Sequence, residues 1–415
     1  MDAARTRSGT NLAESGATEI LYVRSLFRPA DFGGNRYPWE VTRRLALAGH
    51  RVRVVTPRPE GPLPGPTPVE LVYYPASRRT PLETFFTNAL FSRVAVEREM
   101  RRRHVDIVAL SSYEVSFGHY TACPPRVPTV FIYHSSFYSD AVNRLASARW
   151  PRRLAHRPLA AFVHRVEELT FRSATRLVAV SPFSRAEIEA RLGSRSDRID
   201  VIPTGVDTDL FRPGDRAAAR ARLGLALDAK VLLTVGRLSR VKRYDRAIDV
   251  VRLQLSRDPR YLLLIVGKGP EEDALRATAS PLGVAVRFLG FRDGAALRDA
   301  YLAADVTLCT SDFENWSLSI LESLACGTPV VGTPRGSIPD MLRPVDASLV
   351  SSGTDPENIA ATASRLVESD GMLADLGLRA RSFVAERYSW DRTADGLVQC
   401  FDKAIEEHQR QARRP

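Results

Sequence analysis

Short strands of apolar and β-branched residues alternate with helical stretches along both halves of this 415-residue chain. This alternation is typical of a parallel β-sheet that is covered by helices. We expect strands at residues 20–23, 51–56, 107–110, 129–133 and 177–180, and again at 231–235, 262–266, 286–289, 306–309 and 329–331. The sequence therefore predicts an α/β protein with two doubly wound, Rossmann-like domains, which face each other across a deep cleft at the carboxyl ends of both sheets.

Length and composition set the expected domain boundaries. The chain is long enough for two domains, and turn-forming residues between 201 and 213 mark a linker. We expect a disordered leader at 1–18, a first domain at 19–206, a second at 207–388 and a C-terminal helix at 389–415 that crosses back to the first. No apolar run is long enough to span a membrane, and the polar start lacks the apolar core of a secretory signal, which predicts a cytoplasmic protein.

The charge and the cysteines narrow the expected partners. The net charge is +11, yet the chain has only four lysines, a bias that indicates a GC-rich bacterial genome. A basic chain favours anionic partners, but no nucleic-acid-binding motif is present, so we expect no nucleic-acid partner. The four cysteines are scattered without metal-ligand spacing, which predicts reduced thiols and no metal site.

The basic segment 144–172 contains interleaved apolar residues and admits two interpretations. It could lie on an anionic membrane surface, which would make the protein peripheral at the inner face of the membrane. It could instead form a helix that packs on its own domain and leaves an arginine face in water. We favour the second interpretation.

Two carboxylates stand eight positions apart in the segment 313–331. Glu314 lies in the loop after the strand at 306–309, and Glu322 lies about two turns along the helix that follows. The amides of Trp316, Ser317 and Leu318 open that helix, and a helix N-terminus binds anions. Two acceptors for hydroxyl groups with a phosphate-binding helix end between them suit a nucleotide sugar.

The loop after the strand at 231–235 carries Gly236, Arg237 and Lys242. Gly236 lets the backbone approach a ligand closely, while the guanidinium fork and the ammonium group suit a diphosphate. The lysine is informative because the chain otherwise uses arginine. The alternative is a pair of solvated surface cations, and we favour phosphate binding.

Three further motifs are weaker. Gly33 and Gly34 follow the first strand and would permit close backbone approach, although they would also suit an ordinary turn. His134 ends the strand at 129–133, where it could face the cleft, although a structural role is more common for such a histidine. Asp207-Thr-Asp209 resembles a metal-binding DxD motif, but it lies in a proline-flanked turn, so we interpret Asp207 as a cap.

Together these segments resemble the retaining glycosyltransferases of family 4, which have the GT-B fold. The resemblance runs from about residue 19 to residue 390. Besides 314–332, it rests on five blocks in family order, namely Ala179-Val-Ser-Pro-Phe-Ser184, Ile202-Pro-Thr-Gly-Val-Asp207, Gly236-Arg-Leu, Val266-Gly-Lys-Gly-Pro-Glu271 and Phe288-Leu-Gly-Phe291.

The resemblance implies roles for individual residues. Arg237 and Lys242 would hold the donor diphosphate, Glu322 the ribose hydroxyls, and Glu314 the donor sugar or the distal phosphate. The amides of 316–318 would cap the phosphate. Phe291 and Arg292 would face the base. Gly34 would approach both donor and acceptor, and His134 would lie beside the reacting sugar.

The resemblance also implies the reaction, which is transfer of a hexosyl group from a nucleotide diphosphate sugar to a hydroxyl acceptor without a metal or other cofactor. We expect a UDP-sugar donor first and a GDP-sugar second. Asn315 and Ser317 stand where the family often has glycine, so the sugar pocket could be reshaped, and Thr204 and Ser337 are further departures. A sugar-nucleotide epimerase of the same fold and a non-catalytic sugar-nucleotide-binding protein remain alternatives. The acceptor, for which a small metabolite or natural product is attractive, and the oligomeric state stay open.

Overall fold

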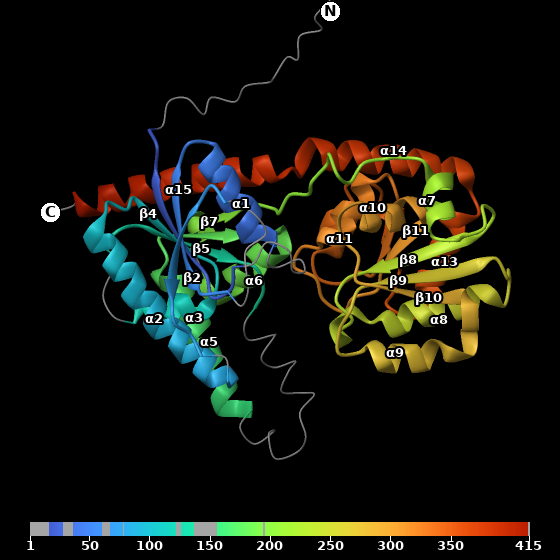
Figure 1. Ribbon diagram of the computed structural model, residues 1–415, viewed down its shortest axis with the longest axis horizontal. Coiled ribbons are helices and arrows are strands. Elements are labelled where there is room, and N and C mark those ends of the chain that lie inside the picture. Colours follow the sequence, from blue (N-terminus) through green and yellow to red (C-terminus); the bar gives the residue numbers. More distant parts are fainter. Residues whose placement is uncertain are drawn as a thin grey trace, which may run out of the picture.

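The computed structural model describes residues 16–27, 36–59, 67–77, 79–121, 126–136, 156–193 and 196–413. Within these ranges the chain forms two parallel β-sheets, each with its own helices, side by side in Figure 1. The expected two-domain α/β architecture is therefore confirmed. Residues 1–15 of the expected leader and the pair Gly33-Gly34 lie outside the described residues.

The first sheet has seven strands in the order β3-β2-β1-β4-β5-β6-β7. Their bounds are β1 Glu19–Val23, β2 Arg51–Pro57, β3 Glu70–Tyr74, β4 Ile107–Leu110, β5 Thr129–Tyr133, β6 Arg176–Ala179 and β7 Ile199–Val201. The sequence predicted five of these strands and missed β3 and β7. The two missed strands are the edges of the sheet, where burial on one side only weakens the apolar signal.

Helices α1 (Arg36–Leu47), α2 (Pro81–Arg102), α3 (Tyr113–Tyr120), α5 (His156–Ser173) and α6 (Pro182–Leu192) cover this sheet. Helix α5 contains the described part of the basic segment 144–172. Its Val163 and Val166 are buried, whereas Arg165 and Arg172 are exposed, which is the arrangement of a helix packed on its own domain. No helix within the described ranges is both long and apolar enough to cross a bilayer.

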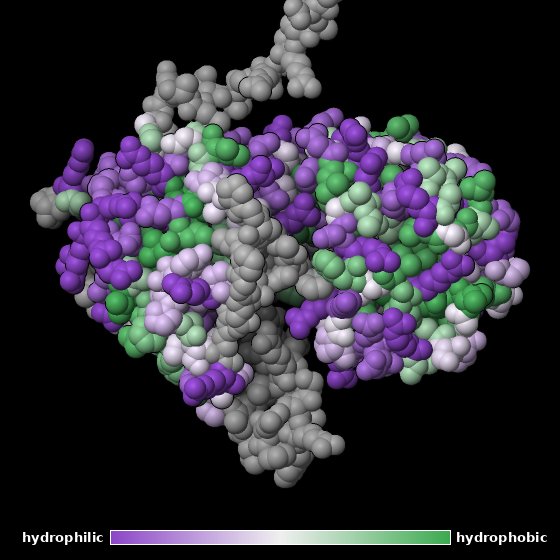
Figure 2. Space-filling view, in the orientation of Figure 1, coloured by the Kyte–Doolittle hydropathy of each residue, from purple (hydrophilic) through white to green (hydrophobic). Residues whose placement is uncertain are grey.

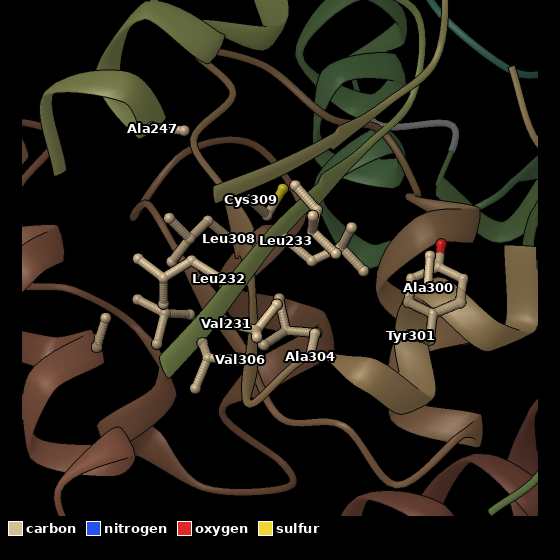
Figure 3. Close-up of a cluster of buried hydrophobic side chains, with 14 of the residues drawn as sticks. Val231, Leu232, Leu233, Ala247, Ala300, Tyr301, Ala304, Val306, Leu308 and Cys309 are labelled. Carbon is tan, nitrogen blue, oxygen red and sulfur yellow. The ribbon is translucent and has the colours of Figure 1, made fainter. Parts of the chain in front are cut away.

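The second sheet has five strands in the order β10-β9-β8-β11-β12. Their bounds are β8 Lys230–Val235, β9 Tyr261–Val266, β10 Val286–Gly290, β11 Val306–Cys309 and β12 Val330–Gly332. All five were predicted. Its helices are α7 Arg216–Arg222, α8 Tyr244–Leu255, α9 Glu272–Ala279, α10 Gly294–Ala303, α11 Leu318–Ala325, α12 Ile338–Leu342, α13 Pro356–Val367 and α14 Asp370–Arg387. Figure 3 shows part of the core, where Leu232 of β8 lies beside Leu308 of β11 and where Ala300 and Tyr301 of α10 lie together farther to the right.

The chain crosses between the domains twice, and the two crossings lie side by side. Helix α15 (Trp390–Ala412) follows the second domain but buries Trp390, Leu397 and Phe401 in the core of the first. The amide of Val206 donates to the carbonyl of Tyr388 at 2.8 Å. A side chain at Gly205 would collide with the backbone of Trp390, because its Cβ would lie 2.2 Å from the Trp390 nitrogen.

Strand order fixes where ligands can bind. In the first sheet the order reverses between β1 and β4, and in the second between β8 and β11. The loops that leave such neighbouring strands diverge and leave a crevice at the carboxyl ends. A cavity between the domains is lined at the second switch point by residues after β8 and β11, such as Lys242 and Glu314, and on the first domain by residues after β1 and β5, such as Arg36 and His134.

Candidate active site in the interdomain cleft

A cavity of about 1000 Å³ lies between the two domains. Figure 2 shows the hollow between the two halves of the molecule. The cavity is lined by nearly all residues that the sequence singled out, namely His134, Gly236, Arg237, Lys242, Phe291, Arg292, Glu314, Trp316, Ser317, Leu318 and Glu322. The predicted set therefore converges on one place, although what each residue binds stays a prediction.

The loops after β8 and β9 meet backbone to backbone. Gly236 and Gly267 have φ values of +145° and +137°, which side chains rarely adopt. A Cβ at Gly267 would lie 1.9 Å from the carbonyl oxygen of Gly236. These glycines bring bare backbone to the cleft wall, beside the exposed cations Arg237 and Lys268.

Lys242 and Glu314 form an ion pair at the second switch point. The ammonium group donates to Oε1 of Glu314 at 2.6 Å, and the Ser311 hydroxyl donates to the same oxygen at 2.7 Å. Burial alone would lower the pKa of Lys242, but the Glu314 carboxylate holds it above its usual value. Lys242 therefore stays charged in the cleft, where it can face an anionic ligand.

Glu322 points into the cleft from α11 and has two protein partners. The Tyr301 hydroxyl donates to its Oε2 at 2.9 Å, and Arg36 of the first domain lies 3.5 Å from its Oε1. Burial raises the pKa of Glu322 to about 7, although Arg36 and Tyr301 lower it in part. Near neutral pH the group is therefore divided between the ionised carboxylate, which can accept hydrogen bonds from hydroxyl groups, and the protonated acid.

The start of α11 supplies backbone donors. Ser317 is its N-cap but makes no side-chain cap, so the amides of the first turn are not satisfied by it. Ser317, Leu318 and Ser319 all line the cavity. The Ser317 amide donates to the Met341 sulfur at 3.4 Å, which is a weak acceptor. An anion there would find backbone donors and the positive end of the helix.

Trp316 has a second role that the sequence did not show. Its indole N–H donates to the carbonyl of Thr204 at 3.3 Å, and its ring meets that of Tyr388 at 5.3 Å between centroids. Thr204 and Tyr388 belong to the two crossings between the domains. Trp316 therefore connects the start of α11 with both segments that join the domains.

His134 lies on the opposite wall, directly after β5. Burial, together with the charge of Arg24, lowers its pKa to about 3, so the imidazole is neutral. Its Nε2 is buried and has no hydrogen-bond partner among the described residues, and the ring packs edge-on against that of Tyr37 at 4.6 Å between centroids. His134 lines the cavity, but with such a low pKa its imidazole is too weak a base to carry a proton near neutrality.

Sequence reasoning missed two contacts across the cleft. Arg36 reaches Glu322 from α1, and the side-chain amide of Asn315 donates to the carbonyl of His134 at 2.6 Å. Arg36 follows the Gly33-Gly34 pair, but nothing in its own sequence context marks it. Lys268 was visible as one of the rare lysines in a glycine-rich loop, and it was not singled out.

Asp207 acts as the turn cap that the sequence predicted. Its Oδ1 accepts from the amides of Asp209 at 3.1 Å and Leu210 at 3.0 Å. Asp207 and Asp209 are also absent from the described residues that line the cavity. The DxD-like pattern is therefore part of the linker and not of the cleft.

Family comparisons cover both domains. Residues 33–210 match the family described as "Glycosyltransferase Family 4", and residues 215–383 match "Glycosyl transferases group 1". A D-inositol 3-phosphate glycosyltransferase of Acidothermus cellulolyticus is 32% identical over 91% of this chain and 87% of its own length. The enzyme of that name from Geodermatophilus obscurus is also 32% identical, over 98% of this chain and 93% of its own length.

Solved structures share the fold. Sucrose-phosphate synthase from Thermosynechococcus elongatus superimposes with a TM-score of 0.79 at 22% identity, and the match covers 94% of this chain and 99% of that one. HepE from Anabaena, in complex with UDP, has a TM-score of 0.71 at 18% identity over 93% and 100% of the two chains. These structures are GT-B glycosyltransferases, so the expected GT-B fold is confirmed.

Proposed function

The chain belongs to the family 4 glycosyltransferases, and from this premise we propose that it moves a hexosyl group from a UDP-sugar to a hydroxyl of a small polyhydroxylated acceptor. We further propose that the anomeric configuration is retained. The observation that carries the proposal is the convergence of Lys242, Glu314 and Glu322 on one cavity between the two domains.

The donor would bind on the wall of the second domain. Arg237, Lys242 and the amides at the start of α11 would hold the diphosphate, and the carboxylate of Glu322 would accept the two ribose hydroxyls. Negative charge grows on the diphosphate as the bond to the sugar breaks, so donors aimed at that place lower the barrier. Lys242 is already held in position and charged by Glu314, 2.6 Å away.

Retention would follow from attack on the face that the diphosphate leaves. The bond from the anomeric carbon to the phosphate oxygen breaks, the bond to the acceptor oxygen forms, and the acceptor proton passes to the departing phosphate. His134 would bind the reacting sugar without exchanging a proton, because its pKa of about 3 keeps it neutral.

The acceptor would lie beside the first domain, where β1 and β4 diverge. Arg24, at the carboxyl end of β1, donates to the Ser111 hydroxyl at 3.3 Å, and the Ser112 hydroxyl accepts from the amide of Ser25 at 3.1 Å. A cation among hydroxyl groups suits a polyol that carries an anionic group. Since the relatives are named for D-inositol 3-phosphate, an inositol monophosphate is the first acceptor to test.

The test is a panel of UDP-, GDP-, ADP- and dTDP-sugars, first as ligands in thermal shift and then as donors to inositol phosphates. We expect the UDP-sugar to raise the melting temperature most, since binding stabilises the folded state. Proton NMR of the product would show an anomeric configuration equal to that of the donor. An inverted product would contradict retention, and interconversion of UDP-sugars without an acceptor would favour the epimerase.

A further inference from the structure

We propose that Arg36 is a positioning residue that couples closure of the cleft to binding of the nucleotide ribose, by holding Glu322 ionised and oriented only when the two domains are together. The proposal rests on the assignment of Glu322 to the ribose in the proposed function. It adds a residue from the opposite domain to the donor site.

The first argument is the geometry of the pair. Arg36 is the first residue of α1 in the first domain, and Glu322 lies on α11 in the second. Their side chains meet at 3.5 Å, and both line the cavity. Because the partners belong to different domains, any opening about the crossings at 203–206 and 388–390 would separate them.

The second argument is the hydrogen-bonding capacity of the carboxylate. An ionised carboxylate accepts about four hydrogen bonds. Tyr301 occupies one site on Oε2, and Arg36 approaches Oε1. About two acceptor sites then remain for a ligand, which matches the two hydroxyls of a ribose, so Arg36 can stay in place while the nucleotide is bound.

The third argument concerns what keeps Glu322 ionised. Arg36 of α1 and Tyr301 of α10 act on Glu322 directly, and Arg36 also pairs with Glu40 of its own helix at 3.6 Å. Cys326 follows α11, and Arg298 of α10 and Arg381 of α14 act on that thiol. Burial raises the pKa of Tyr301 well above its usual value and that of Cys326 to about 12, so both are neutral. Arg298 and Arg381 bond to backbone carbonyls, of Arg212 and Ala325 among others.

Arg36 is therefore the charged group among the described residues that pairs with Glu322 directly. An opposite charge at such a distance lowers the pKa of an acid by about 1–3 units. Without Arg36, a buried Glu322 would be protonated at neutral pH, and its O–H could no longer accept from both ribose hydroxyls. Opening of the cleft would have the same effect and would favour release of the spent nucleotide.

The experiment measures the affinity of the full chain for UDP at pH 6.5, 7.5 and 9 by calorimetry. The variants are Arg36→Gln, Arg36→Lys and Glu322→Gln, with Arg43→Gln as the matched control. Arg43 is an exposed arginine on the same helix and does not line the cavity. Because the variants are compared at the same pH, the effect of UDP ionisation on affinity cancels between them. Thermal melts without nucleotide show whether each variant is folded.

We expect Arg36→Gln to weaken UDP binding about tenfold at pH 6.5, as one pKa unit would, and about twofold or less at pH 9. Arg36→Lys should stay near the wild type, and Arg43→Gln should be indistinguishable from it. In a Glu322→Gln background, Arg36→Gln should add nothing. A deficit that is equal at all three pH values, or none at all, would overturn the coupling while leaving the proposed function intact. A wild-type protein that binds no nucleoside diphosphate would overturn the proposed function and this inference with it.

Discussion

The two walls of the cleft differ in what holds their side chains in place. On the second domain, Lys242, Glu314 and Ser311 fix one another through contacts within that domain. On the first domain, Arg36 pairs with Glu40 of its own helix and with Glu322 across the cleft, and the carbonyl of His134 accepts from Asn315 across it. The wall of the second domain, which would bind the donor in our proposal and which we call the prebuilt donor wall, is thus held largely by its own contacts, whereas the opposite wall depends more on contacts between the domains.

The largest effect should come from breaking the prebuilt wall at Lys242. Lys242→Ala removes the charge nearest the proposed diphosphate, so we expect turnover to fall about 10²–10³-fold, or about 2.7–4 kcal/mol. Initial rates with a UDP-sugar measure it. The matched control is Lys230→Ala, at the opposite end of β8, where the lysine pairs with Asp258 at 2.9 Å. Equal losses in both variants would mean that Lys242 acts through stability and not through the donor.

Substitution of Arg237 tests the proposed phosphate binding on the same wall, at a side chain that is exposed to solvent. It lines the cavity, whereas Arg240 in the same loop is exposed but does not. We expect Arg237→Ala to raise the activation free energy that corresponds to kcat/KM by about 2 kcal/mol, the size of a charge-assisted hydrogen bond. The melting temperature should not change. Arg240→Ala should leave both unchanged. Full activity in Arg237→Ala would remove the phosphate clamp from the proposal.

We expect ionised Glu322 to lower the stability of the unliganded protein. Burial raises its pKa from 4.5 to about 7, so the folded protein holds a proton there that the unfolded chain has lost. The free energy of unfolding therefore falls as pH rises from about 4.5 to about 7 and stays lower above that. We expect Glu322→Gln to stabilise the unliganded protein at pH 8 by about 1–3 kcal/mol while weakening UDP binding.

Thermal melts of Glu322→Gln and the wild type at pH 5 and pH 8 measure this difference in stability. The gain should be small at pH 5, where the carboxyl group is already protonated in the folded protein, and larger at pH 8. A variant that melts below the wild type at pH 8 would show instead that Arg36 and Tyr301 compensate the charge of Glu322 fully, and that ionisation does not destabilise the fold.

The same contrast between the walls explains what the sequence could predict. The five strands of the second sheet, the loop with Lys242 and the helix with Glu322 are specified by neighbours in the sequence, such as a strand followed by glycine and a charge. Arg36 and Asn315 act through partners 286 and 181 positions away, respectively, since they contact Glu322 and the carbonyl of His134. Such contacts depend on how the crossings set one domain against the other, which no local pattern encodes.

Trp316 shows within a single residue what the sequence can predict and what it cannot. The sequence placed its backbone correctly at the start of α11, because the loop and helix pattern is local. Its side chain instead bonds to Thr204 and packs on Tyr388, in the two crossings. The position of the backbone was predictable, and the reach of the side chain was not.

The smallest effect should come from Asn315, which tests whether closure completes the opposite wall. Asn315→Ala removes the hydrogen bond to the His134 carbonyl, a loss of about 1 kcal/mol, or about fivefold in kcat/KM. The affinity for UDP alone should hardly change, since the lost contact joins the domains and does not touch the proposed diphosphate site. Asn315→Asp should be worse than Asn315→Ala, because a carboxylate oxygen would then face the carbonyl oxygen in place of the amide donor. If the alanine variant instead weakened UDP binding as much as catalysis, Asn315 would belong to the donor wall, and the division between the two walls would fail at this residue.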